Sequence, residues 1–446
     1  MRFGNRRLRI LVGDSRDSVY RQAVDLVIAS GASRAARIAV DLLALARSPL
    51  VVEDLQHAAG EEFRPEVRGA MVRLRAELLA KAPEARTEGL RVRSLQDQMR
   101  RLDRLLLEGP TKPPMLVRRA MANRSLARWL PGLGTREVVF FDRGTPWRAF
   151  VIRPNGEVVH VELPFAQGAL AESWLALRTN FDIASRSPAA HRSGFIDRTT
   201  ESCLHHLGQL RRALWDPLPL THERIVVVPI GELHGVPLEA LGDEAGHIVS
   251  RTPHPALLSR GRSHRPRRAL VLAGEDAEME AEAREAASIL EQTGWTVVRS
   301  DHVDVEMARG GAIGLLHVAA HGTFHREGWL FSGIDLPHGR LYFEDLRRTR
   351  LRDALILLTS CDSGRVDSLP GSNVEGWITA GLSAGARELV LAGWKIDGGN
   401  ARRFAHEFHR RWNGAADAAP AVAFGRASLR ARHPHPHGWA GYMVAG

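Results

Sequence analysis

Cysteine is scarce in this sequence: Cys203 and Cys361 are the only two thiols among 446 residues. Two cysteines cannot build a disulfide framework, which agrees with a protein that works in a reducing compartment. No apolar run approaches the roughly 20 residues that a membrane-spanning helix needs. The apolar part of the basic N-terminus, LRILVG, is too short for the core of a signal peptide. The sequence therefore predicts a cytoplasmic protein without a membrane partner.

Lysine is almost absent as well. Lys81, Lys112 and Lys395 are the only lysines, and the other 58 of the 61 basic residues are arginine. The net charge of +10 alone would suit a nucleic-acid partner. However, the arginines are interspersed with acidic residues, as in 65–105, and no known nucleic-acid motif or Walker-type phosphate loop occurs. We therefore expect neither a direct nucleic-acid ligand nor a nucleotide cofactor.

The first part of the chain has the composition of a helical region. Residues 16–130 are poor in β-branched runs and rich in Ala, Leu, Arg and Glu. The sequence GPTKPP at 109–114 ends the last helical pattern, because proline cannot continue a helix. We expect residues 1–130 to form a helical N-terminal region. Three stretches in it have apolar residues at helical spacing: 23–46, 67–82 and 90–109.

A second pattern begins near residue 136. Short β-rich runs alternate with turn residues over 136–164. The Asn-Gly pair within 154–156 is typical of a hairpin turn, because both residues tolerate a positive φ. The sequence predicts a β-hairpin segment here, followed by helices at 168–182 and 196–214.

From residue 224 onward, apolar strands alternate with amphipathic helices. This alternation is typical of a mostly parallel sheet that is covered by helices on both faces. We expect one α/β region over 131–446, divided into a first half at 131–268 and a second half at 269–446. The expected strands are 224–230, 269–274, 296–300, 312–320, 354–360 and 388–394, and the expected helices are 277–293, 371–385, 398–413 and 419–431.

Two of the apolar runs stop abruptly at a reactive side chain. LLHVAA (315–320) ends at His321, and LILLTS (355–360) ends at Cys361. The carboxyl ends of strands in an open α/β sheet are where ligands bind. An imidazole beside a thiol accepts its proton, or stabilises the thiolate as an imidazolium. A free thiol with a pKa of about 8.5 needs such help to react at neutral pH.

The residues around this pair suit acyl transfer. Gly322 has no Cβ, so a substrate can approach its backbone closely. The backbone amides of Gly322 and Cys361 are candidates for an oxyanion hole, which stabilises charge on a scissile carbonyl. Two other interpretations stay open, because Cys361 can also be a buried packing residue or a redox-sensing thiol. His317 competes with His321 as the base, although its place inside the apolar run favours a packed or supporting role.

HVAAHG (317–322) and LLTSCDSG (357–364) together resemble the sequence blocks of the CHAT domain, a caspase-like and separase-like cysteine peptidase domain. Either block alone would be weak, whereas the pair is specific. The resemblance covers roughly 130–446, and it includes the stretches 136–164, 224–243, 272–290, 375–412 and 435–446.

The resemblance implies a caspase-like α/β fold with His321 as general base and Cys361 as nucleophile. It implies a cysteine endopeptidase that cleaves a protein substrate and is activated by a sensor partner; a catalytically silent scaffold is the alternative. Two departures are visible. The residues beside the cysteine are Ser360, Asp362 and Ser363, where the family usually has a small residue and Glu-Thr. The helical repeats that often precede the domain are reduced here to the pattern in 16–130.

Substrate preference is the next expectation. Relatives that cut after a basic residue use an acidic residue in the pocket, and Asp397 lies where the resemblance would put such a group. A carboxylate can pair with a guanidinium through two hydrogen bonds. Asp362 and Glu375 are alternatives. Asp397 can equally cap the helix that begins near Gly398, and Asp362 suits a turn.

Two further groups of residues have simpler explanations. HPHPHG (433–438) has histidines at every second position. A zinc site requires further ligands in tetrahedral geometry, and the sequence has no paired cysteines to supply them. A proline-stiffened turn before the last strand explains this stretch. Cys203 lies near His205 and His206 at helical spacing, which favours a packing role. The sequence therefore predicts neither a metal nor a cofactor.

Overall fold

The computed structural model of the chain describes residues 20–46, 126–164, 167–186, 193–259, 265–300, 312–324, 332–347, 349, 351–369 and 373–446. Within the expected N-terminal helical region, residues 20–29 and helix α2 (Ala35–Ala46) are helical. The stretches 67–82 and 90–109, which were also expected to be helical, lie outside the described residues.

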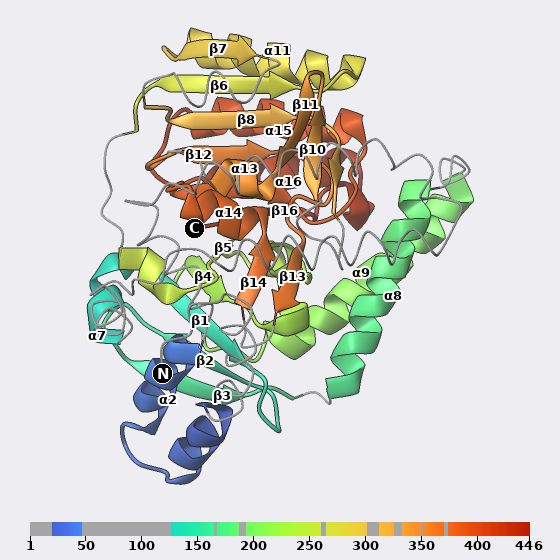
Figure 1. The fold of residues 1–446 in the computed structure, drawn as a ribbon. Helices are drawn as coiled ribbons and strands as arrows, with labels where there is room; N and C mark the ends of the chain where they lie inside the picture. The colour runs from blue at the N-terminus through green and yellow to red at the C-terminus, as the bar shows by residue number, and fades with distance from the viewer. Residues whose placement is uncertain are drawn as a thin grey trace, which may run out of the picture.

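One sheet organises the protein (Figure 1). Its strands are β1 (Glu137–Asp142), β2 (Arg148–Ile152), β3 (Val158–Glu162), β4 (Arg224–Val228), β5 (Ile248–Arg251), β6 (Arg268–Ala273), β7 (Thr296–Ser300), β8 (Leu315–Ala319), β12 (Leu355–Leu358), β15 (Glu388–Ala392) and β16 (Tyr442–Ala445). The order across the sheet is β3-β2-β1-β4-β5-β16-β15-β12-β8-β6-β7. Neighbours are parallel, except that β2 is antiparallel to β1 and β3, and β16 is antiparallel to β15.

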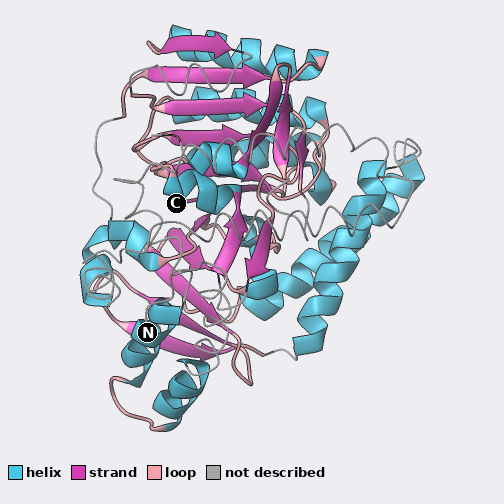
Figure 2. Ribbon diagram, viewed as in Figure 1, coloured by secondary structure: helices cyan, strands magenta, loops and turns pink. Residues whose placement is uncertain are grey.

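Helices cover both faces of this sheet (Figure 2). They are α7 (Leu126–Trp129), α8 (Gln167–Arg186), α9 (Ser193–Leu214), α10 (Leu238–Glu244), α11 (Ala277–Gln292), α13 (Phe343–Arg347), α14 (Trp377–Ser383), α15 (Gly398–Trp412) and α16 (Ala419–Arg432). The side chains of a strand alternate between the two faces. In β12, Leu355 and Leu357 pack with α15 and α16, whereas Ile356 and Leu358 pack with α13 and α14. The expected mostly parallel α/β sheet with helices on both faces is therefore confirmed.

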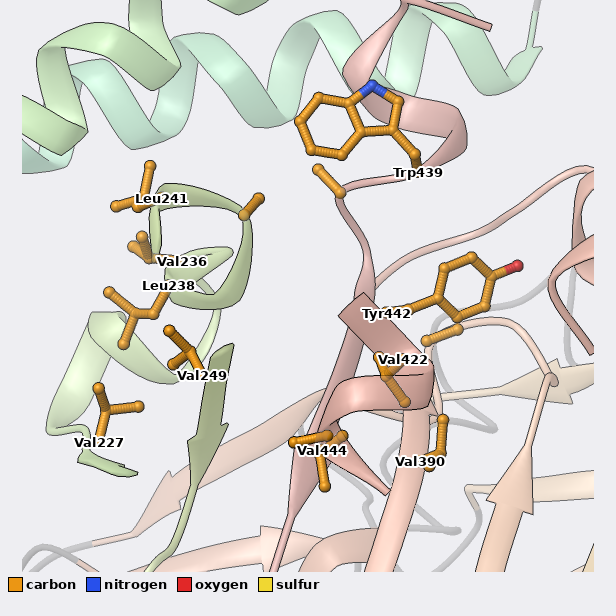
Figure 3. Packing of buried hydrophobic residues seen from close by; sticks show 14 of the residues in the cluster. Val227, Val236, Leu238, Leu241, Val249, Val390, Val422, Trp439, Tyr442 and Val444 are labelled. Carbon is orange, nitrogen blue, oxygen red and sulfur yellow. The ribbon is translucent and has the colours of Figure 1, made fainter. Parts of the chain in front are cut away.

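The last strand joins the two parts of the sheet. Strand β16 pairs with β5 on one side and with β15 on the other, so residues near the C-terminus connect strands from both halves. Figure 3 shows the core at this junction, where Val249 of β5 faces the same interior as Val444 and Tyr442 of β16. The sheet is continuous across the two expected halves because β16 lies between them.

The N-terminal helices pack against the first strands. Val24, Ala39 and Val40 are buried in one cluster with Phe140 of β1 and Phe150 of β2. Apolar burial of this kind holds the N-terminal segment to the sheet at roughly 25 cal/mol per Å² removed from water. No helix within the described ranges is long and apolar enough to cross a membrane.

One stretch differs from the sequence-based expectation. A helix was expected at 371–385, but residues 373–376 form strand β14 (Asn373–Gly376), which pairs with β13 (Val366–Leu369), and only α14 is helical. The local sequence contains Gly371 and Gly376, which weaken a helix. A separate small sheet, β11-β10-β9, contains β9 (Gly322–Thr323), β10 (Gly333–Leu336) and β11 (Gly339–Tyr342). Neither small sheet was expected, because their strands are too short for a periodic pattern.

Candidate active site

A cavity of about 830 Å³ opens at the carboxyl edge of the sheet, and both His321 and Cys361 line it. The arrowheads of β6, β8 and β12 point toward this edge in Figure 1. Further walls come from the start of α11, the start of α15, the segment 433–438 before β16 and the α8–α9 pair. The two reactive residues, 40 positions apart in the sequence, therefore open into one space.

Strand register explains why the two reactive residues lie near each other. Strands β8 and β12 are parallel neighbours, and His317 lies opposite Leu357. Because side chains alternate, every second residue after these two lies on the same face. His317 faces the side that α11 and α15 cover, where it contacts Glu282 and His409; β8 and β12 then end at Ala319 and Leu358, so His321 and Cys361 lie just beyond two adjacent strand ends. The cavity lies on the side that α11 and α15 cover.

Gly322 makes the close approach between the two blocks. A Cβ atom at this position would lie only 2.5 Å from the carbonyl oxygen of Cys361 and 3.1 Å from the Cβ of Ser360. Such contacts are too short for any larger residue without movement of backbone. Glycine is therefore needed so that the segment after His321 can pack against the segment that carries Cys361.

The turn after β12 is held firmly. The Ser363 hydroxyl donates to the carbonyl of Leu358 (3.1 Å) and accepts from the amide of Ala392 (2.9 Å). Asp362 has a φ of 57°, in the left-handed region. Asp occupies that region more readily than most residues, and strained backbone of this kind clusters at functional sites. The turn thereby presents Cys361 at the cavity in a fixed conformation.

The Cys361 thiol is half-buried and donates to the carbonyl of Ile396 at 3.8 Å. Burial raises the pKa of this thiol, and the nearby Asp362 carboxylate raises it further, whereas Lys395 opposes the shift. Burial likewise raises the pKa of Asp362. Among the hydrogen bonds of the described residues, none joins the His321 imidazole to the thiol. The thiol is therefore protonated at neutral pH in this arrangement.

The three candidate specificity residues differ in position. Asp397 is exposed, lines the cavity and caps α15, where its carboxylate accepts from the amide of Asn400 at 3.2 Å. Asp362 pairs with Arg365 at 3.4 Å and is not among the described residues that line the cavity. Glu375 lies in β14 opposite Asp367, and its side chain is outside what the structure describes. Of the three, only Asp397 both caps a helix and lines the cavity.

Histidines near the C-terminus form one side of the cavity. His433, His435 and His437 all line it, and residues 436–438 form the single turn η6 (Pro436–Gly438) before β16. Burial, with a contribution from His435, lowers the pKa of His437 to about 4. The Nε2 atom of His435 lies 3.8 Å from the sulfur of Cys203, which is fully buried. The described residues contain no group of three or more side chains placed to hold a metal ion.

The α8–α9 pair supplies a wall from the first half of the chain. Ala184, Ser185 and Thr199 line the cavity. The ring of Phe181 packs on Trp394, with 4.4 Å between the ring centroids. Trp394 precedes the segment that reaches Asp397, so this helix pair contacts the wall of the site directly. Sequence reasoning expected these helices but not their contact with the cavity.

Two further residues at the cavity were missed. Glu282 of α11 and Thr359 both line it, and both are buried. His317, the alternative base, is also buried and bonds to Glu282 at 3.0 Å. Glu282 shares the buried face of α11 with Ala286 and Leu290. A carboxylate at the i, i+4, i+8 spacing of an otherwise apolar face was the signal available in the sequence.

The chain is thus an α/β protein whose mostly parallel sheet carries a cavity with a histidine and a cysteine at its carboxyl edge. The family model for the CHAT domain matches residues 204–446, more than half of the chain, and the chain belongs to the CHAT domain family. No curated protein matches the chain.

Solved structures show the same fold at low identity. Two crystal structures of the Saccharomyces cerevisiae separase–securin complex match with TM-scores of 0.56 and 0.55, at 9% and 11% identity, over 74% and 79% of this chain. The chain spans about a third of the separase chains, 31% and 33%. A structure of the Arg specific cysteine proteinase gingipain R matches with a TM-score of 0.39 at 11% identity, over 62% of this chain and 75% of that one.

Proposed function

We propose that the protein is a cysteine endopeptidase in which Cys361 is the nucleophile and His321 the general base. The observation that carries this proposal is that both side chains open into one cavity at the carboxyl edge of the sheet. Membership of the CHAT domain family and the separase-like fold support it. The buried His317 is engaged with Glu282, so it is a poor candidate for the base.

The reaction follows from the two side chains. His321 takes the thiol proton, and the thiolate attacks the carbonyl carbon of the scissile peptide bond. The C–N bond breaks, the imidazolium gives its proton to the leaving amine, and a thioester remains on Cys361. Water then attacks the thioester with His321 again as base, which releases the new carboxylate and restores the thiol.

The amide of Gly322 is available for an oxyanion hole. The amide of Asp335 donates to the carbonyl of His321 at 2.9 Å, on one side of the Gly322–Ile334 pair. In antiparallel strands such a flanking bond belongs to a non-hydrogen-bonded pair, so Gly322 does not donate to Ile334. This leaves its N–H free of β10. Together with the amide of Cys361 it is our candidate for stabilising the developing oxyanion.

The protonated thiol points to a resting state. Without a hydrogen bond between His321 and Cys361, and with the pKa of the thiol raised, a further movement is needed before attack. We infer that a partner protein drives it. The N-terminal helices pack on β1 and β2, and the α8–α9 pair reaches the cavity, so either offers a route for the signal. We propose residues 1–130 as the helical region that receives the partner and 131–446 as the peptidase region.

Asp397 is our candidate for recognising a basic residue before the cleaved bond. We expect Asp397→Asn to lower the ratio of cleavage after Arg to cleavage after Gln by about tenfold, because a charge-assisted bond is lost. Asparagine caps helices as well as aspartate, so the thermal midpoint should stay unchanged. Matched peptides that differ only at this residue measure the ratio. An unchanged ratio would remove Asp397 from specificity and leave Asp362 and Glu375 as alternatives.

A catalytically silent scaffold is the second candidate. The raised pKa of Cys361 and its lack of a bond to His321 favour it. Alkylation by iodoacetamide, followed by peptide mass spectrometry, separates the two. With cell extract present as a source of the activating partner, we expect His321→Ala to slow alkylation of Cys361 in a peptidase by about tenfold, because the imidazole of the activated site no longer takes the thiol proton. For a scaffold the substitution changes nothing.

The same assay gives a pH dependence. Because burial raises the pKa of Cys361, we expect the alkylation rate of the isolated chain to keep rising above pH about 8.5, where an ordinary thiol is half ionised. Cys203 is the internal control, since burial raises its pKa to about 12 and its sulfur should react far more slowly. The series is repeated with cell extract as a source of the partner, which is expected to move the rise to lower pH. A rate already constant at neutral pH in the isolated chain would contradict the resting state.

A further inference from the structure

Four buried polar side chains lie directly behind the cavity; Glu282, His317, Thr359 and His409 are here called the buried cluster. Glu282 Oε1 accepts two hydrogen bonds, from His317 Nε2 at 3.0 Å and from the Thr359 hydroxyl at 2.6 Å. The other nitrogen of His317, Nδ1, lies 3.2 Å from His409 Nε2. All four residues are at least nine-tenths buried. Buried polar groups of this kind are costly unless each is satisfied.

The protons in the cluster have one consistent arrangement. Burial, with the neighbouring His317, lowers the pKa of His409, so its ring is neutral. Its Nδ1 has no partner among the described residues, and a bare lone pair there costs less than an unpaired N–H. His409 therefore donates through Nε2 to His317, and His317 donates through Nε2 to Glu282. Every donor points along the chain of bonds toward the Glu282 carboxylate.

The cluster joins the two strands that carry the reactive residues. His317 lies in β8, four residues before His321, and Thr359 follows β12, two residues before Cys361. The ladder between these strands ends at the pair Val318–Leu358. The next bond, from the amide of Thr359 to the carbonyl of Val318, is long at 3.4 Å. Beyond that point the Thr359 hydroxyl lies 3.3 Å from the carbonyl of Val318 and 2.6 Å from Glu282 Oε1, so the shorter link between the strand ends runs through the oxygen that Thr359 shares with His317.

We propose that Glu282 is a positioning residue: by accepting from β8 and β12 with one oxygen, it fixes the offset between His321 and Cys361. The proposal rests on the proposed function only for the roles of His321 and Cys361. The two hydrogen bonds to Glu282, here called the clamp, are present whatever the protein does. Glu282 also lines the cavity, so the clamp lies at the floor of the site and not elsewhere in the core.

The test measures proximity without requiring catalysis. In a background with His321→Cys and Cys203→Ala, the thiols at 321 and 361 are cross-linked with dibromobimane, and the rate is followed by fluorescence and mass spectrometry. Glu282→Leu, which removes both bonds, should lower the rate by about tenfold. Glu282→Gln keeps an acceptor oxygen at the same place and should stay within about twofold of the parent. Glu285→Leu is the matched control, because it removes a carboxylate of the same helix that pairs with Arg402 of α15 and, among the described residues, bonds to neither β8 nor β12.

Each outcome decides the proposal. Slow cross-linking in Glu282→Leu with rescue in Glu282→Gln supports it. Equal rates in Glu282→Leu and Glu285→Leu overturn it, and so does an equal loss in Glu282→Gln and Glu282→Leu, which would assign the effect to charge. If Glu282→Leu fails to fold, Thr359→Val, which removes one of the two bonds, decides by a loss of about threefold or by none. Cross-linking as expected, together with a wild-type chain that cleaves nothing even in cell extract, would count against the proposed function alone.

Discussion

Cleavage of protein substrates is expected to vanish in Cys361→Ala, with a loss of at least about a thousandfold, because the substitution removes the thiol that forms the covalent intermediate. The comparison uses extract of the cells from which the gene comes, which supplies both substrates and partner. New protein N-termini are counted by mass spectrometry after incubation with the purified wild type or the variant. Equal cleavage by the two proteins would remove the dyad from the mechanism.

Two companion variants sharpen this result. Cys203→Ala is the matched control, because Cys203 is the other thiol of the chain and is buried beneath the wall of the cavity. It should cleave like the wild type. His321→Ala should lose about a hundredfold or more, the usual contribution of a general base. A loss in Cys203→Ala as large as that in Cys361→Ala would indicate that folding, not chemistry, had failed.

The main sheet was predictable because its strands are long enough to carry a pattern. Strands β4, β7, β8, β12 and β15 fall within the stretches expected from apolar runs, and β6 begins one residue before its expected stretch. Helices α11, α15 and α16 lie within one residue of their expected bounds. The fully buried runs of β8 and β12 are typical of parallel strands covered on both faces. Strand β5 was not predicted, because its four residues include a buried arginine, Arg251, which interrupts the apolar pattern.

The candidate site was predictable in part. The ends of β8 and β12 could be located from the points where apolar runs stop, and parallel strands meet at one edge. Contacts made by distant segments could not be read in this way. Phe181 reaches Trp394, and His435 reaches Cys203, only because helices α8 and α9 pack beside the segment before β16. No local periodicity encodes such a contact.

The protonation of the Cys361 thiol could be judged only from the structure. From the sequence, the imidazole was expected to assist the thiol directly. In the structure, burial and Asp362 raise the pKa of Cys361, and no bond to His321 is formed among the described residues. A residue adjacent in sequence, Asp362, affects the thiol because the left-handed turn holds the two close. The reactive groups share a cavity, and their final approach is left to the movement that we propose.

The largest effect on stability is expected at Arg426, whose guanidinium is buried between the two halves of the chain. It donates to both oxygens of Asp243, at 2.6 and 2.7 Å, and to the carbonyl of Tyr442 at 2.8 Å. Asp243 belongs to α10 of the first half, whereas Arg426 and Tyr442 belong to α16 and β16 of the second. Tyr442, which accepts from Arg426, is labelled in the core drawn in Figure 3. The pair therefore ties the two halves where β16 completes the sheet.

Arg426→Met should lower the free energy of unfolding by about 3–5 kcal/mol, because it leaves a partly buried carboxylate and a buried carbonyl without their donor. The matched control is Arg430→Gln, one turn later on α16, whose exposed guanidinium pairs with Glu244 at 3.1 Å. An exposed pair contributes about 0–1 kcal/mol, so this variant should unfold close to the wild type. Urea unfolding of the full chain, followed by tryptophan fluorescence, measures both. Equal midpoints for Arg426→Met and Arg430→Gln would mean that apolar packing alone, through residues such as Val249 and Val444, holds the two halves together.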